Sequence, residues 1–266
     1  MDSSSIEAIK NQERLIEKEI AEKIPFVSDF IPIQELKNDY QPDDDIYQSK
    51  IKNLERDYKY IRRTRPDGNC FFRAFGFAYF ESLLSCDNKD DQANKDELDN
   101  FITLMQESKQ QLIELGLPSV TIEDFYETSL ETLLSIKNKE IETPEQLLER
   151  FCEQTTSDYI VVYFRLITSG YLQKNSDKFS NFIVGTSSIV DFCKTEVEPM
   201  YRESDHIHVV AITSALQVKT RIIYMDRCSS ADGSVNAHDF PDQEHPTKCR
   251  IHLLYRPGHY DVLYPR

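Results

Sequence analysis

The stretch TRPDGNCFFRAFGF, residues 64–77, combines a tight turn with the start of a strongly apolar segment. The preceding run YKYIRRT at 58–64 predicts a short strand, because aromatic and β-branched residues favour strands. Pro66, Asp67 and Gly68 are typical turn residues, and glycine adopts backbone angles that other residues avoid. The phenylalanine-rich segment at 70–84 predicts a helix. Cys70 is therefore expected in the first turn of this helix.

A cysteine at this position has two interpretations. Unpaired N–H groups and the positive end of the helix dipole favour a thiolate at a helix N-terminus. The same N–H groups can stabilise the oxyanion that forms during acyl transfer. A buried structural cysteine after an ordinary turn is the alternative, and the motif D-G-N-C by itself favours that alternative.

The end of the chain supplies a second candidate group. Arg256-Pro257-Gly258 predicts a tight turn, and HYDVLY at 259–264 predicts a strand after it. Strand alternation places His259 and Asp261 on one face, where the carboxylate can orient the imidazole. An exposed His–Asp pair on an edge strand is the alternative. Together with Cys70, however, the pair matches the pattern of a Cys-His-Asp hydrolase.

The remaining segments predict an α+β domain whose sheet is assembled from distant strands. Thr121 and Thr143 are candidate N-caps, and Gln146 completes a capping box only with Thr143. We expect exposed loops over 86–99 and between the strands at 219–226 and 249–256. The predicted helices cover 70–84, 97–115, 121–136, 143–151, 157–172 and 206–217, and the predicted strands cover 58–64, 219–226, 249–256 and 259–264.

The N-terminal 45 residues differ from the rest and predict an acidic, partly helical arm, followed by a catalytic domain over 46–266. Residues 1–50 contain 12 acidic and 6 basic side chains. Apolar residues recur at roughly helical spacing over 5–23, and the PDDD sequence at 42–45 is typical of a solvated linker. A frayed tail and an arm that orders on contact with a partner both fit this pattern.

Composition excludes several classes of function. The 266-residue chain carries a formal net charge of −15, which disfavours nucleic acid as a partner. It has no apolar run long enough to span a membrane and no signal-peptide pattern, so we expect a cytoplasmic protein, with a nuclear pool left open, and reduced cysteines. The spacings His206-x-His208 and Cys249-x-x-His252 lie in predicted core elements. We therefore expect neither a metal nor a cofactor.

Several motifs, in one order, resemble the otubains, which are ovarian-tumour-domain cysteine proteases that remove ubiquitin. The resemblance extends from about residue 46 to the end of the chain and implies a papain-like fold, with a small central sheet between helical layers. It implies that Cys70 is the nucleophile, His259 the general base and Asp261 the orienting acid, with Asp67 in the active-site loop. The motifs are TRPDGNCFFRAFGF (64–77), SDYIVVYFRLITSGYLQ (157–173), EVEPM (196–200), SDHIH (204–208) and YRPGHYDVLY (255–264).

The resemblance also implies a function and its partners. We expect hydrolysis of isopeptide bonds in ubiquitin chains, with a preference for lysine-48-linked chains. Binding of ubiquitin-charged E2 conjugating enzymes, and their inhibition without proteolysis, is expected of the N-terminal arm. The alternative is a catalytically weak regulator that binds ubiquitin and E2 enzymes. A papain-like protease acting on ordinary peptides is a third possibility, but the chain lacks a C-G-S-C-W signature.

Overall fold

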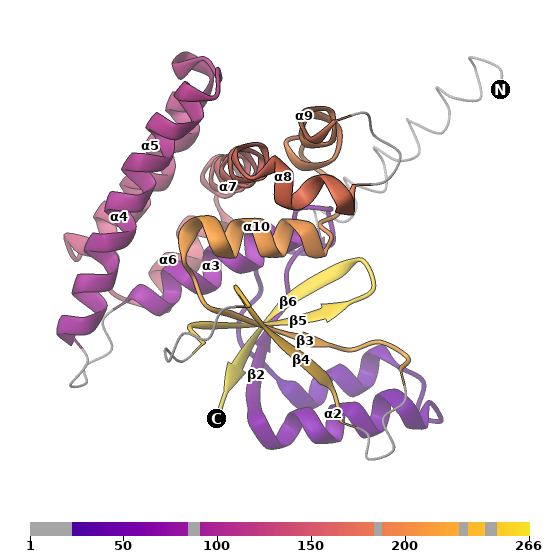
Figure 1. The fold of residues 1–266 in the computed structure, drawn as a ribbon. Helices are drawn as coiled ribbons and strands as arrows, with labels where there is room; N and C mark the ends of the chain where they lie inside the picture. The colour runs from indigo at the N-terminus through magenta and orange to yellow at the C-terminus, as the bar shows by residue number, and fades with distance from the viewer. Residues whose placement is uncertain (1–22, 85–90, 184–187, 229–233, 243–248) are drawn as a thin grey trace, which may run out of the picture.

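A single mixed sheet organises the computed structural model, which describes residues 23–84, 91–183, 188–228, 234–242 and 249–266 (Figure 1). The strand order is β1-β2-β6-β5-β3-β4. All neighbouring strands are antiparallel except β3 and β5, which are parallel. The strands are β1 (Ile31–Pro32), β2 (Tyr58–Arg62), β3 (Thr220–Tyr224), β4 (Asn236–Phe240), β5 (Ile251–Arg256) and β6 (His259–Pro265).

Helices cover both faces of the sheet, which confirms the α+β fold with a small sheet between helical layers (Figure 1). α3 and α10 pack on one face, with α7 packed against these two helices, and η1 and α2 pack on the other face. The longer helices are α2 (Asp45–Asp57), α3 (Cys70–Leu83), α4 (Asp91–Glu114), α5 (Ser119–Lys137), α6 (Pro144–Cys152), α7 (Gln154–Lys174) and α10 (His206–Leu216). The shorter ones are η1 (Ile33–Asp39), α8 (Ser176–Phe179), η2 (Ser180–Phe182), α9 (Ile189–Phe192) and η3 (Cys193–Val197).

The phenylalanines of α3 form the centre of the larger core. Phe71, Phe72, Phe75, Phe77 and Phe80 are fully buried. They contact β5, β6, α6 and α7, so α3 is enclosed on nearly every side. Each such burial contributes about 1.5–3 kcal/mol relative to an exposed side chain. This packing fixes the position of the N-terminal end of α3, where Cys70 lies.

Three local predictions were wrong. The loop predicted over 86–99 is helical from Asp91 onward, because Leu98 and Phe101 give α4 a buried face; residues 86–90 lie outside the described part. The loop predicted between the strands contains β4, which among the described strands is an edge strand that pairs only with β3. Thr121 is not an N-cap, since α5 begins at Ser119, whereas the capping box of Thr143 is confirmed.

The described part of the predicted arm packs against the sheet. Phe26, Val27, Ile33 and Leu36 are buried. Asp44, within the predicted linker, accepts a hydrogen bond from the backbone of Tyr47 and caps α2. The helix predicted over 5–23 lies almost wholly outside the described residues.

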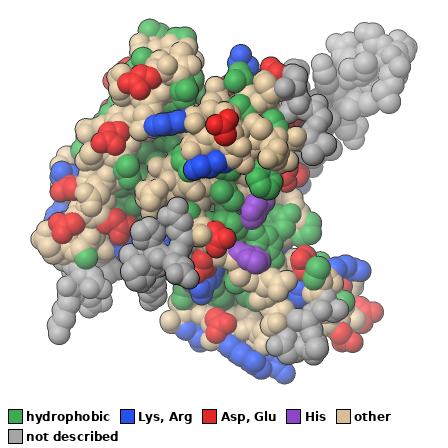
Figure 2. Space-filling view, in the orientation of Figure 1, with side chains coloured by type: hydrophobic (Ala, Val, Ile, Leu, Met, Phe, Trp, Pro, Cys, Tyr) green, Lys and Arg blue, Asp and Glu red, His purple; other side chains and the backbone are tan. Residues whose placement is uncertain are grey.

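The surface drawn in Figure 2 carries both signs of charge. Acidic and basic side chains are interspersed over the helical part of this face, beside exposed hydrophobic side chains. None of the helices within the described ranges is long and apolar enough to cross a membrane.

Candidate active site

Cys70 is the first residue of α3 and is 3% exposed. The turn before it needs glycine at position 68, where φ is +74° and a Cβ atom would lie 2.5 Å from the carbonyl oxygen of Tyr201. A larger residue would therefore suffer both backbone strain and a clash with a fixed peptide group. The close approach of the Tyr201 peptide therefore requires glycine two residues before Cys70.

Two backbone amides of the turn are free to bind an anion. The N–H of Asp67 donates to the carbonyl of Arg65, and the N–H of Asn69 donates to Oδ1 of Asp67 at 2.9 Å. The N–H groups of Gly68 and Cys70 have no hydrogen-bond partner among the described residues. At a helix N-terminus, such groups form a site for a developing oxyanion.

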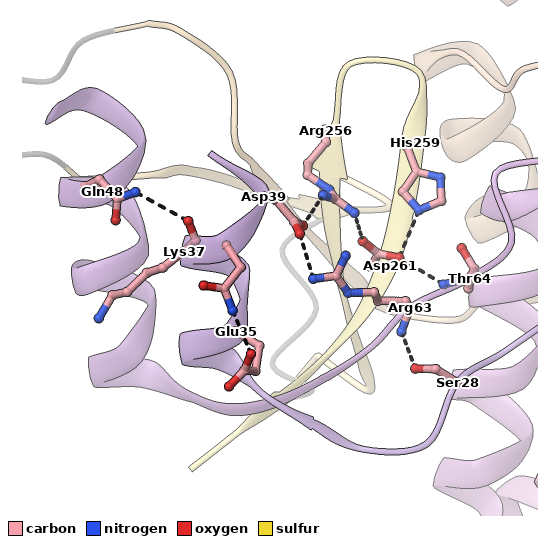
Figure 3. A network of polar contacts seen from close by, with 11 residues as sticks. Ser28, Glu35, Lys37, Asp39, Gln48, Arg63, Thr64, Arg256, His259 and Asp261 are labelled. Atoms are coloured by element: carbon pink, nitrogen blue, oxygen red, sulfur yellow. Dashed lines mark hydrogen bonds and ion pairs between the residues drawn. The ribbon is translucent and has the colours of Figure 1, made fainter. Parts of the chain in front are cut away.

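His259 and Asp261 lie at the start of β6, side by side as strand alternation predicts (Figure 3). Nε2 of His259 is 2.9 Å from Oδ1 of Asp261. Asp261 is fully buried, and it also accepts hydrogen bonds from the backbone of Thr64 and the guanidinium of Arg256. The carboxylate is thus held by three donors, and it fixes the orientation of the imidazole.

The surroundings of this pair shift the pKa values of both groups. Burial lowers the pKa of His259, but hydrogen bonding to Asp261 and the adjacent Cys70 thiol together raise it to about 9. Burial raises the pKa of Asp261, but hydrogen bonding to His259 and the positive charge of Arg256 keep it below its usual value. Nδ1 of His259 is buried and, apart from the Cys70 thiol, has no hydrogen-bond partner within the described ranges. That nitrogen is available to exchange a proton with Cys70.

Asp67 stabilises the turn before Cys70 through hydrogen bonds of its carboxylate. Its Oδ2 accepts a hydrogen bond from Nη2 of Arg73 at 2.9 Å, one turn further along α3. Arg73 is fully buried, contacts Asp158 on α7 and stacks on the ring of Phe26. The structure therefore assigns Asp67 to the support of the turn, together with its acceptance of the Asn69 N–H.

Arg165 and Asn69 are two further site residues that sequence reasoning missed. Arg165 is fully buried on α7 and donates to the carbonyls of Gly68, Val197 and Arg202 and to Oδ1 of Asn69, at 2.7–3.0 Å. Asn69 also accepts from the backbone of Tyr201. The only available signal was an arginine within the apolar run IVVYFRLI, which predicts a buried partner but not its identity.

His208 and His252, which belong to the two ligand-like spacings, each make a structural contact. Nδ1 of His208 accepts the N–H of Asp205 at the start of α10, and burial lowers the pKa of His208 to about 4. His252 contacts the hydroxyl of Tyr58 at 2.9 Å. Across the ranges that the structure describes, no three His, Cys, Asp or Glu residues are grouped so that they could hold a metal ion.

Comparisons with known proteins agree with this geometry. The Peptidase C65 Otubain family model matches residues 19–265. The ubiquitin thioesterase OTUB1 of Homo sapiens is 46% identical over 258 residues, which cover 97% of this chain and 90% of that protein. The ovarian tumor domain-containing deubiquitinating enzyme 1 of Arabidopsis thaliana is 39% identical over 287 residues, which cover 99% of this chain and 92% of the relative.

A solved structure of related sequence has the same fold. It is described as h/ceOTUB1 with ubiquitin aldehyde and UBC13~Ub. The match has a TM-score of 0.89 at 34% sequence identity and covers 99% of both chains. By sequence, family model and fold, this chain belongs to the otubain family of cysteine peptidases.

Proposed function

We propose that this chain is a deubiquitinase that hydrolyses the isopeptide bond at the terminal glycine of ubiquitin. The observation that carries the proposal is the placement of the Cys70 thiol at the N-terminus of α3, beside an imidazole that Asp261 orients. The relatives named ubiquitin thioesterase, and the related structure with ubiquitin aldehyde, supply the substrate class.

The reaction follows from the positions of these groups. Nδ1 of His259 takes the thiol proton, and the Cys70 thiolate attacks the glycine carbonyl. The N–H groups of Gly68 and Cys70 stabilise the oxyanion, an effect of roughly 10²–10³-fold for each donor. His259 then protonates the departing lysine amine, leaving a thioester on Cys70. Water, deprotonated by His259, hydrolyses the thioester and releases the ubiquitin carboxylate.

Lysine-48-linked chains are the proposed substrate. Such selectivity requires one ubiquitin site on each side of Cys70, one for the donor tail and one for the acceptor. We assign the arm, residues 1–45, to the acceptor site and residues 46–266 to the catalytic domain. The linkage comes from the resemblance to otubains and not from individual residue types. A cytoplasmic location belongs to the same proposal.

A second, non-catalytic function involves E2 enzymes. Two related solved structures contain UBC13~Ub or UBCH5B~Ub together with ubiquitin aldehyde. The apolar residues Ile6, Ile9, Leu15, Ile16 and Ile20 give the arm a thin amphipathic stripe that fits a docking helix. We assign inhibition of ubiquitin-charged E2 enzymes to this stripe.

A gel assay with di-ubiquitins of every linkage tests the catalytic proposal. The wild-type chain should cleave the lysine-48-linked form selectively, and Cys70→Ala should cleave none. Cleavage of all linkages at equal rates would refute the linkage preference. Absence of cleavage by the folded wild-type chain would favour the alternative, a weak regulator that binds ubiquitin and E2 enzymes.

An E2 discharge assay separates the second function from the first. Cys70→Ala should still inhibit ubiquitin transfer from a charged E2, whereas the chain without residues 1–22 should not. Inhibition that survives removal of this segment would contradict the role of the arm.

A further inference from the structure

Arg256 lies between two carboxylates, and only one of them belongs to the proposed catalytic residues (Figure 3). Nη2 donates to Oδ2 of Asp261, and Nη1 donates to Oδ2 of Asp39 at 2.9 Å. Asp39 is the last residue of η1, far from Asp261 in the sequence. The tight β5–β6 hairpin pairs Arg256 directly with His259, so the guanidinium reaches the same face as the imidazole.

Asp39 is itself held from two sides. Its second oxygen, Oδ1, accepts a hydrogen bond from Nη2 of Arg63 at 2.9 Å. The backbone N–H of Arg63 donates to Oγ of Ser28, which ties this strand end to the N-terminal segment. Each oxygen of Asp39 therefore binds one guanidinium, and the carboxylate is fixed in position relative to Arg256.

This arrangement matters for the charge on Asp261. A carboxylate stabilises an imidazolium best when its negative charge is not drawn toward another cation. Arg256 is such a cation, and the negative charge of Asp39 offsets part of the positive charge of Arg256. Without Asp39, Arg256 would interact with Asp261 alone and weaken the hold of Asp261 on protonated His259. The side chains of Arg256 and Asp39 are 18% and 22% exposed, so water and salt moderate the effect.

We propose that Asp39 is a positioning residue for the active site. It holds Arg256 between two carboxylates, and this keeps Asp261 oriented toward His259 with its negative charge available to stabilise the protonated imidazole. A segment outside the sequence motifs of the site would thereby contribute to the basicity of the general base. The expected change in the pH–rate profile rests on the proposed function, whereas the expected change in the pKa of His259 does not.

Other charged and titratable groups also face this cluster. Glu203 lies beside the turn that joins β5 and β6, since its carboxylate would contact a Cβ atom placed at Gly258. Tyr40 follows η1, and Arg256 opposes the rise in its pKa that burial causes. Among the described residues, the charged and titratable groups placed around His259 and Asp261 include Cys70 from α3, Arg256 from β5, Asp39 and Tyr40 from η1 and its end, Arg63 after β2, and Glu203 from the segment before α10.

The test measures the pKa of His259 directly, by NMR titration of ¹⁵N-histidine-labelled full-length chain. Asp39→Asn removes the charge and nearly preserves the shape, and Asp39→Glu restores the charge. Glu35→Gln is the matched control, because Glu35 is an exposed carboxylate on the same 3-10 helix that accepts from Asn38. His259→Gln assigns the resonance.

We expect Asp39→Asn to lower the pKa of His259 by roughly 0.3–1 unit, with recovery in Asp39→Glu and no change in Glu35→Gln. The alkaline limb of kcat/KM for a fluorogenic ubiquitin amide should move by the same amount. A loss of thermal stability in Asp39→Asn with an unchanged His259 pKa would show a merely structural role and overturn the proposal. If the wild-type chain does not cleave ubiquitin substrates, the proposed function fails, but the NMR titration still decides this inference.

Discussion

Nε2 of His259 lies 2.9 Å from Oδ1 of Asp261, and that oxygen also accepts the backbone N–H of Thr64. The backbone of Thr64, just after β2, thus fixes the Asp261 carboxylate, and the carboxylate in turn orients the imidazole of His259 on β6. Because Asp261 engages Nε2, the imidazole presents Nδ1 toward Cys70. This relationship determines which nitrogen exchanges protons in the proposed reaction.

The raised pKa of His259 predicts a pH-dependent stability. Because its folded-state pKa is about 9 against an ordinary value of 6.5, the native state binds this proton more tightly than the unfolded chain. The contribution is fully present below pH 6.5 and disappears as pH rises through about 9. Between pH 6.5 and about 9, the free energy of unfolding of the wild-type chain, measured with urea, should fall by ~1–3 kcal/mol more than that of His259→Gln. Equal losses in both proteins would contradict the pKa assigned to this histidine.

Asp261→Asn should reduce kcat/KM by roughly 10²–10⁴-fold, since the amide neither stabilises the imidazolium nor selects the tautomer. The alkaline limb of the pH–rate profile should also move to lower pH. Steady-state kinetics with a fluorogenic ubiquitin amide measure both effects. Asp43→Asn makes the same chemical change at an exposed position and should leave both unchanged. A fully active Asp261→Asn variant would remove the carboxylate from the mechanism.

Gly68→Ala should destabilise the fold and impair catalysis together. The new methyl group would lie 2.5 Å from the carbonyl oxygen of Tyr201, on a residue whose φ is +74°. Gly116→Ala is the matched control, because φ is +91° there but nothing lies within 4 Å of the new Cβ. Thermal denaturation should show the control paying only the backbone strain of ~1–3 kcal/mol. Gly68→Ala should lose more stability than this control and should also lose activity. Equal losses of stability in the two variants would show that the contact with Tyr201 is unimportant.

Arg165→Met should lower the free energy of unfolding by ~2–4 kcal/mol, because several buried acceptors lose their donor. The lost contacts include the carbonyl of Gly68, so the turn before Cys70 should also loosen and kcat should fall. Arg150→Met removes an exposed arginine that pairs with Glu153 and should cost less than ~1 kcal/mol. Denaturant titrations of the two variants provide the comparison. A value for Arg165→Met as small as that for Arg150→Met would contradict the bridging role.

The sequence predicted those parts of the fold that depend on local patterns. The turn at 65–69, the helix that follows it and the hairpin containing His259 all have short-range signals. β4 was missed because most of its side chains are exposed and its pairing with β3 is non-local. The early start of α4 was missed because dense charge at 91–97 hides the buried face that begins at Leu98.

The candidate site divides in the same way. Cys70, His259 and Asp261 belong to short motifs whose residue types and spacing make them candidates, and the resemblance to otubains adds Asp67. Arg165 binds carbonyls from segments more than 30 residues away, and Asp39 binds Arg256, which is 217 residues away in the sequence. Contacts of this kind arise only when the chain is folded, and no local pattern encodes them.

The central claim is that Cys70 is the nucleophile toward the ubiquitin C-terminus. Intact-mass spectrometry after incubation with ubiquitin vinyl methyl ester tests it most directly. The wild-type chain should gain the mass of one ubiquitin, with the adduct mapped to Cys70, and Cys70→Ala should gain none. Cys228→Ala, which removes an exposed thiol, should react like wild type. An adduct that persists in Cys70→Ala, or that maps to Cys228, would contradict the account.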